Sequence, residues 1–290
     1  MSNADPITPP AASEEEVVRV SARAWEQDRY LSALLAPRAV RQGLLALAAF
    51  AGEIARIPAF VSDPMMGEIR LQWWREAVES SDPTTRSGHP VADAVVATAR
   101  RHDLPVGLLI GFIDAQTAAL YDEPIADDQG LAQHLAKTEG ALFELALMVM
   151  GNRGETARAV AFAAGQAYGI SRLLVEMPAL WAQGRTLIPV SRLAASDLTV
   201  ANVQAGVAAE RLQPILNGLA SEARHHLAEA RRLGSGLLRA QHVAVLPLAV
   251  VEPYLQALER KRRDPLRDPL EISPLRRVWT LWRSHVGRRF

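Results

Sequence analysis

The sequence predicts an all-α protein, and three observations support this fold class. Apolar residues recur at intervals of three and four along most of the chain, as at Leu44, Leu47, Ala51 and Ile54, which is the spacing of one face of an α-helix. Prolines and N-capping residues stand where these stretches begin. We find no stretch of useful length in which apolar and polar residues alternate, as they do in a half-buried strand.

The composition is that of a globular protein with a buried core. Of the 290 residues, 49% are hydrophobic and 22% are charged, which is ordinary for such a protein. The 32 basic and 32 acidic residues cancel, so no overall field attracts nucleic acid, and we expect none as a partner. The absence of cysteine excludes disulfides and thiolate metal sites and fits a reducing cytoplasm.

The first half of the chain divides into a leader and several helices. Residues 1–13 are polar, acidic and proline-containing, so we expect a disordered leader. Ser13 precedes three glutamates, an N-cap with acids in the first turn of a helix. Prolines near the first helical position predict further helices that start at Pro37, at Asp63-Pro64, at His89-Pro90 and at Pro105.

The second half is expected to contain longer helices, over about 127–150, 154–183, 199–233, 236–262 and 275–286. The helix over 154–183 is rich in alanine and glycine, and Gly165 and Gly169 lie one turn apart. Small residues permit close neighbours, so we place this helix centrally. Pro247 should kink or divide the helix that contains it. One helical domain over 14–271 followed by a C-terminal helix over 272–290 is the simplest organisation.

Four blocks spread over most of the chain are distinctive. Residues 29–37 contain Arg-Tyr-Leu and Leu-Ala-Pro, residues 67–75 read Gly-Glu-Ile-Arg-Leu-Gln-Trp-Trp-Arg, and residues 139–146 read Glu-Gly-Ala-Leu-Phe-Glu-Leu-Ala. With the block over 168–189, they resemble the squalene/phytoene synthase-like family of head-to-head trans-isoprenyl diphosphate synthases. The similarity is greatest to a branch whose mitochondrial relatives are complex I assembly factors. The resemblance implies a single isoprenoid-synthase-like helical bundle around a central cavity.

Synthases of this family hold Mg²⁺ with two D-x-x-x-D motifs, and the metal neutralises the departing pyrophosphate. A spacing of four places both carboxylates of a motif on one helix face. The resemblance places the first motif on Ala55 and Ala59 and the second on Glu176 and Leu180. We therefore expect no metal site and no cofactor, and Mg²⁺ only if the protein is an enzyme after all.

Several residues are candidates for a remnant of the synthase site. Glu53 and Glu176 are the vestigial catalytic candidates. Glu176 is either a leftover metal ligand or the partner of Arg172 one turn earlier, and the helical spacing favours the pairing. Arg56 either binds a phosphate or neutralises Glu53. The candidates for phosphate binding are Arg56, Arg172, Tyr168 and Arg185.

The C-terminal segment is basic and amphipathic. Residues 272–290 contain no acid, and a helix would place Leu275, Val278, Trp279 and Trp282 on one face. Such a helix either lies on a membrane surface or docks its tryptophan face onto the bundle, and both interpretations stay open. The candidates for a membrane or partner surface are Arg276, Arg277, Trp279, Trp282 and Arg283.

The resemblance implies a non-catalytic assembly factor for respiratory complex I, located in the cytoplasm or peripherally at the inner face of the membrane. The expected partners are complex I subunits, other assembly factors, an isoprenoid lipid or the membrane surface. Two alternatives remain: an active head-to-head prenyltransferase that uses prenyl diphosphates and Mg²⁺, and an isoprenoid-binding or lipid-binding module without catalysis. An open apolar cavity would favour lipid binding, and a filled one would favour protein binding.

Overall fold

The computed structural model describes residues 13–80, 86–205, 209–259, 272–287 and 290. Within these ranges the chain forms helices joined by loops, and no strand occurs, which confirms the predicted all-α class. Residues 1–12 of the predicted leader and the predicted domain boundary at residue 271 lie outside the described residues.

The N-terminal part of the bundle begins where the capping signals predict. The Ser13 hydroxyl accepts a hydrogen bond from the Glu16 amide at 3.2 Å, and the Asp63 carboxylate accepts one from the Met65 amide at 2.9 Å. The predicted helix from Pro105 is divided in two. The helices are α1 (Glu14–Trp25), α2 (Gln27–Leu34), α3 (Arg38–Ala55), α4 (Ile57–Phe60), α5 (Pro64–Glu79), α6 (Pro90–Arg101), α7 (Val106–Asp114) and α8 (Thr117–Leu120).

The C-terminal part differs most from prediction around Pro247. The expected helix over 236–262 is divided, because proline lacks the amide hydrogen that an α-helix interior needs and Pro247 lies in a 3₁₀ turn. The elements are α9 (Asp128–Leu135), the π-helical turn η1 (Ala136–Gly140), α10 (Ala141–Val149), α11 (Glu155–Ala182), α12 (Val190–Ala194), α13 (Val200–Gln204), α14 (Ala209–Leu233), η2 (Gly234–Gly236), α15 (His242–Val245), η3 (Leu246–Val250), α16 (Val251–Leu258) and α17 (Pro274–Gly287).

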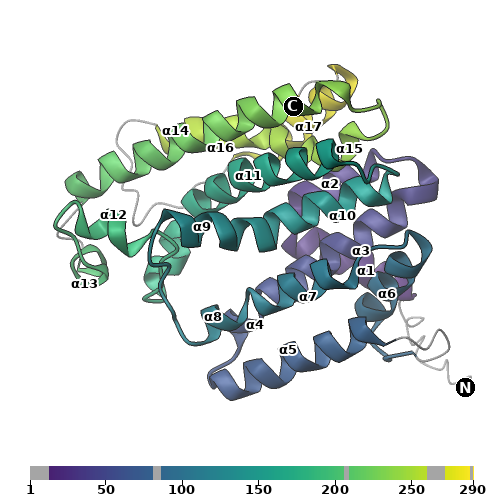
Figure 1. Ribbon diagram of the computed structural model, residues 1–290, viewed down its shortest axis with the longest axis horizontal. Coiled ribbons are helices and arrows are strands. Elements are labelled where there is room, and N and C mark those ends of the chain that lie inside the picture. The colour runs from purple at the N-terminus through teal and green to yellow at the C-terminus, as the bar shows by residue number, and fades with distance from the viewer. Residues whose placement is uncertain (1–12, 81–85, 206–208, 260–271, 288–289) are drawn as a thin grey trace, which may run out of the picture.

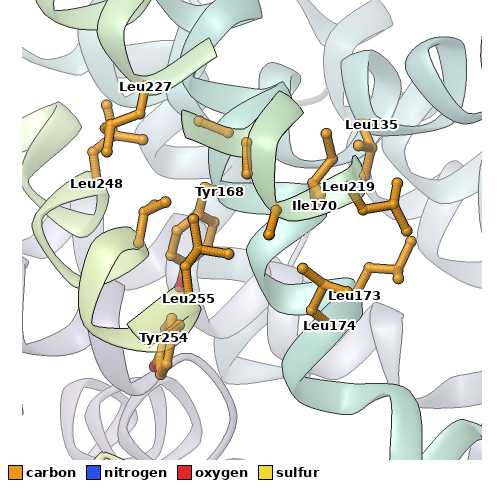
Figure 2. Close-up of a cluster of buried hydrophobic side chains, with 14 of the residues drawn as sticks. Leu135, Tyr168, Ile170, Leu173, Leu174, Leu219, Leu227, Leu248, Tyr254 and Leu255 are labelled. Atoms are coloured by element: carbon orange, nitrogen blue, oxygen red, sulfur yellow. The ribbon is translucent and has the colours of Figure 1, made fainter. Parts of the chain in front are cut away.

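Helix α11 occupies the middle of the bundle, between α14 on one side and α9, η1 and α10 on the other (Figure 1). Its apolar face packs against α14, η3 and α16. Figure 2 shows part of this buried cluster, which includes Leu135, Tyr168, Ile170, Leu173, Leu174, Leu219, Leu227, Leu248 and Leu255. Burial of this apolar surface is the main force that stabilises the arrangement.

Helix α11 approaches its neighbours closely at the two glycines that the sequence singled out. A Cβ on Gly165 would lie 2.5 Å from the Cα and N atoms of Gly140, and a Cβ on Gly169 would lie 2.5 Å from a methyl group of Leu135. Backbone atoms cannot rotate away as a leucine side chain can. Contact between α11 and η1 therefore depends on glycine at position 165.

We expect Gly165→Ala to lower the free energy of unfolding by about 3 kcal/mol or more, at the upper end of overpacking costs. Gly169→Ala should cost less, about 1–2 kcal/mol, since Leu135 can change rotamer. Gly218→Ala is the matched control: its Cβ would meet no atom within 4 Å, so alanine should be neutral or stabilising by up to about 1 kcal/mol. Urea unfolding of the three variants measures these changes. Equal losses at positions 165 and 169 would contradict the backbone clash.

Candidate functional site

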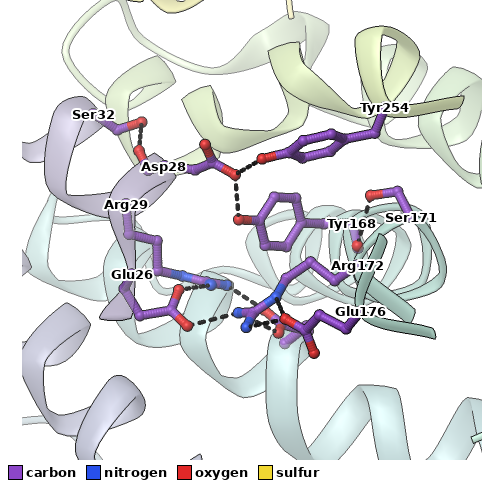
Figure 3. Close-up of polar contacts among 10 residues, drawn as sticks. Glu26, Asp28, Arg29, Ser32, Tyr168, Ser171, Arg172, Glu176 and Tyr254 are labelled. Atoms are coloured by element: carbon purple, nitrogen blue, oxygen red, sulfur yellow. Dashed lines mark hydrogen bonds and ion pairs between the residues drawn. The ribbon is translucent and has the colours of Figure 1, made fainter. Parts of the chain in front are cut away.

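Four charged side chains from three segments form a closed ring of ion pairs inside the bundle (Figure 3). Glu26, which precedes α2, contacts Arg29 at 2.9 Å and Arg172 of α11 at 2.6 Å. Glu139 of η1 contacts Arg29 at 2.6 Å and Arg172 at 3.1 Å. Two cations thus alternate with two anions. The side chains are between 3% and 22% exposed, so this ion-pair ring is largely shielded from water.

The electrostatics keep the ion-pair ring charged. Burial alone would raise the pKa of the Glu139 carboxyl, but Arg29 and Arg172 outweigh burial and hold that pKa below its usual value. Burial alone would lower the pKa of Arg172, but Glu176, Glu26 and Glu139 outweigh it and raise that pKa well above its usual value. Each charge is therefore stabilised by its neighbours in the ion-pair ring.

Glu176 lies at the edge of the ion-pair ring. Its carboxylate is 2.7 Å from an Arg172 nitrogen, so the structure places it in the pairing that the helical spacing favoured. At 45% exposure it is in contact with water, unlike Glu26 and Glu139. The Arg29 guanidinium lies 5.1 Å from the ring centroid of Phe143 and 5.0 Å from that of Tyr168. These two aromatic rings cover the other side of the cluster.

A second polar cluster centres on Asp28. One carboxylate oxygen of Asp28 accepts hydrogen bonds from the hydroxyls of Tyr168, at 2.9 Å, and Tyr254, at 2.8 Å. The other oxygen lies 3.0 Å from Nε of Arg277 as an ion pair, although the N–H is not directed at it. Burial raises the pKa of Asp28, and the nearby Arg277 offsets this only in part. Burial and the Asp28 charge raise the pKa of Tyr168 well above its usual value.

Arg277, one of the candidates for a membrane or partner surface, points into the bundle rather than outward. Its guanidinium is 17% exposed and also donates to the Tyr254 hydroxyl at 3.0 Å. Asp28 attracts it inward, and the residue therefore anchors α17 to α2 and α16.

Two of the four phosphate-binding candidates lie in these clusters and two do not. Tyr168 and Arg172 are central to them. The Arg56 guanidinium stacks on Trp25 and Phe60, 4.6 Å and 5.5 Å from their ring centroids. Arg185 pairs with an Asp122 carboxylate oxygen at 3.1 Å, just after the C-terminal end of α11.

Among the described residues, Glu53 forms no ion pair with either arginine of the ion-pair ring and is not a member of it. Its carboxylate accepts a hydrogen bond from the Ser21 hydroxyl at 2.9 Å and lies 3.3 Å from Nε2 of His89. No ion pair joins it to Arg56 in the described part of the chain, so the expected neutralisation of Glu53 by Arg56 is not observed. Of the two adjacent tryptophans on α5, Trp74 is buried and Trp73 lies at the rim.

Sequence reasoning did not assign a role to most members of the two clusters. Those missed are Glu26, Asp28, Arg29, Glu139 and Tyr254. Two signals were available. Glu26 and Arg29 have the spacing of a helical ion pair, and Arg29 and Glu139 each open a block that carries the family resemblance.

The space beside the ion-pair ring is almost filled. Arg29 and Ser32, together with apolar residues of α3, α10, α15 and η3, enclose a cavity of about 20 Å³. A cavity of that size holds about one water molecule, whereas pockets for small ligands measure roughly 300–1,000 Å³. This cavity beside the ion-pair ring is therefore too small for a prenyl chain.

Solved structures identify the fold. Squalene synthase HpnC from Alicyclobacillus acidocaldarius matches with a TM-score of 0.71 at 20% identity, over 86% of this chain and 94% of that chain. A dehydrosqualene synthase in complex with a ligand matches with a TM-score of 0.74 at 14% identity, over 95% and 97%. The bundle is thus the all-α isoprenoid synthase fold, as predicted.

The family follows from the sequence match. The squalene/phytoene synthase model covers residues 22–283, so the chain belongs to the squalene/phytoene synthase family. The protein named NADH dehydrogenase (ubiquinone) complex I, assembly factor 6, of Mus musculus is 26% identical over 266 residues, which are 90% of this chain and 80% of the relative. The predicted family and its resemblance to the assembly-factor branch are confirmed. Within the described ranges, no helix is long and apolar enough to cross a membrane.

Proposed function

We propose that this protein is a non-catalytic member of its family that assists the assembly of respiratory complex I. The observation that carries the proposal is that the polar interior is occupied by its own ion pairs: Arg172 contacts Glu26, Glu139 and Glu176. The small cavity of about 20 Å³ beside it supports a protein-binding role over isoprenoid binding beside the ion-pair ring. The name of the mouse relative supports complex I subunits or other assembly factors as partners.

The residues at the positions where the resemblance places the synthase metal motifs do not fit Mg²⁺. Ala55 and Ala59 offer no oxygen ligand, nor does Leu180, and the Glu176 carboxylate is held by Arg172. Mg²⁺ requires hard oxygen ligands in near-octahedral geometry. Among the residues that the structure describes, no three His, Asp or Glu side chains converge to hold a metal ion. We accordingly propose that the protein needs no metal cofactor.

The location is also part of the proposal. We propose that the protein is cytoplasmic and binds as a peripheral protein to the inner face of the membrane, where complex I is assembled.

The proposal predicts that the purified protein releases no pyrophosphate above background from farnesyl or geranylgeranyl diphosphate with Mg²⁺ or Mn²⁺. Glu176→Ala should behave in the same way, because its carboxylate is not a metal ligand. Phosphate-coupled detection of pyrophosphate measures this, with an active squalene synthase as the positive control. Metal-dependent release that Glu176→Ala abolishes would overturn the non-catalytic assignment.

The assembly role has its own readout. Cells that lack this protein should contain less complex I on native gels, and both the wild-type chain and Glu176→Ala should restore it. Gly165→Ala is the destabilised control and should restore less complex I than the wild-type chain does. Normal complex I in cells without the protein would contradict the assembly role, whatever the result of the pyrophosphate assay.

A further inference from the structure

Helix α17 presents its tryptophan face to solvent. Leu275 is 84% exposed, Trp279 is 59% exposed and Trp282 is 46% exposed, and Val278 and Val286 extend the same stripe. The rings of Trp279 and Trp282 lie 5.2 Å apart between centroids. The opposite face, with Leu281 and Ser284, packs on the bundle. Of the two interpretations left open by the sequence, the docked tryptophan face is therefore excluded.

A basic groove runs beside this stripe. It has a volume of about 1110 Å³ and lies between α17, the end of α14 and the segment from η2 to η3. Trp279 belongs to both the stripe and the groove. The lining side chains include Arg231, Arg239, His242 and Arg283, and no Asp or Glu lines the groove among the residues that the structure describes.

Two of these arginines lack a protein partner. Arg239 and Arg283 are exposed, and neither has a hydrogen bond or ion pair within the described part of the chain. Arginines elsewhere differ: Arg192 contacts two carboxylates and Arg224 contacts two more. Arg231 donates to the backbone carbonyl of Phe290. Within the described residues, the positive charge of Arg239 and Arg283 is therefore not neutralised by an ion pair.

The charged and apolar features lie on adjoining flanks of one helix. Arg276 and Arg283 are seven residues apart, so they share the flank of α17 next to the stripe. Tryptophans beside a row of cations, on a helix of low overall hydrophobicity, are typical of helices that lie in a membrane interface. Tryptophan prefers the headgroup level, and anionic lipids attract basic segments by about 1 kcal/mol per Lys or Arg.

We propose that α17 and this groove dock onto an anionic phospholipid bilayer. A headgroup phosphate lies between Arg239 and Arg283, and Leu275, Val278, Trp279, Trp282 and Val286 enter the headgroup region. Charge complementarity selects this occupant, because the acid-free lining suits a phosphate. This inference rests on the proposed location at a membrane and not on the assembly role. A negative result in the vesicle experiment would therefore leave the assembly role standing, and a negative result in the complex I experiment would leave vesicle binding standing.

Sedimentation of the full chain with vesicles tests the proposal. The chain should bind vesicles of phosphatidylcholine mixed with phosphatidylglycerol, bind those of phosphatidylcholine alone much more weakly, and dissociate as salt is added. Arg239→Gln should weaken binding about fivefold, and Arg239→Gln with Arg283→Gln roughly 25-fold. Trp279→Ala with Trp282→Ala should weaken binding to the same vesicles. Circular dichroism checks that each variant is folded.

Matched substitutions on α5 provide the control. Arg70 and Ile69 are exposed there, and Arg70→Gln with Ile69→Ala should leave vesicle binding unchanged. The proposal is overturned if this control weakens binding as much as the α17 and groove variants do. It is also overturned if binding ignores phosphatidylglycerol, or if inorganic phosphate releases the protein where sodium chloride of equal ionic strength does not, which would indicate a site for the free ion. If the chain captures an acidic protein and binds no vesicles, α17 and the groove form a protein-binding surface and the proposal is overturned.

Discussion

Replacing Arg172 by methionine is expected to lower the free energy of unfolding by about 3–5 kcal/mol, the typical cost of removing one partner from a buried ion pair. The substitution leaves Glu26 and Glu139 with Arg29 as their sole cation in the ion-pair ring, and both carboxylates are nearly inaccessible to water. Methionine keeps the length of the side chain, so lost charge rather than lost volume dominates. Urea unfolding measures the change.

Two further variants distinguish the contribution of the buried ion pairs of Arg172 from that of its exposed pair with Glu176. Glu176→Ala removes the half-exposed partner of Arg172, and its cost should be about 0–1 kcal/mol, as for a surface pair. Arg172→Met combined with Glu139→Gln removes one charge of each sign and should recover part of the stability that Arg172→Met loses. If the double variant is no more stable than Arg172→Met, uncompensated charge is not the cause of the loss.

Replacing Asp28 by alanine is the second change with a large expected effect. It leaves the buried hydroxyls of Tyr168 and Tyr254 without an acceptor, and each unsatisfied group costs about 1–3 kcal/mol. We therefore expect a loss of about 3 kcal/mol or more. Asp28→Asn keeps an acceptor oxygen at the same place and removes the buried charge, so it should cost clearly less. Equal losses for alanine and asparagine would contradict this account of the cluster.

The comparison with Asp28→Asn also predicts a pH dependence. Because burial raises the pKa of Asp28 above its unfolded value of about 3.9, the folded protein binds this proton more tightly than the unfolded chain does. The stability of the wild type relative to Asp28→Asn should therefore increase as pH falls from the folded pKa of Asp28 towards about 4. Unfolding both proteins over a pH series measures the difference. A difference that instead grows with rising pH would show that the pKa is lowered.

Much of the fold could be predicted from local signals. Ser13, Asp63 and His89 precede helices because capping and the first-turn proline depend on neighbours within a few residues. Pro247 shows the limit of such signals. Its effect on the helix was foreseen, but whether the chain would bend or change to a 3₁₀ turn depended on the packing of η3 against α2 and α17.

Much less of the site than of the fold could be predicted from the sequence. Arg172 and Glu176 could be paired because they are one helical turn apart. The contact of Arg172 with Glu26 joins residues 146 positions apart, and no periodicity encodes it. Arg56 and Glu53 illustrate the same limit: a pair between them was one of two open alternatives, but Arg56 contacts Trp25 of α1 and Glu53 contacts His89, which precedes α6.

The sequence by itself determined the helical class, the family and the amphipathic character of α17, because these depend on composition, periodicity and motif spacing. The tertiary structure decided which charges meet and which face of α17 remains outside. Asp28 attracts Arg277 inward, and this contact turns Trp279 and Trp282 to solvent. Long-range ion pairs and helix orientation depend on the packing of the whole bundle, since each is the sum of contacts between segments that lie far apart in the chain.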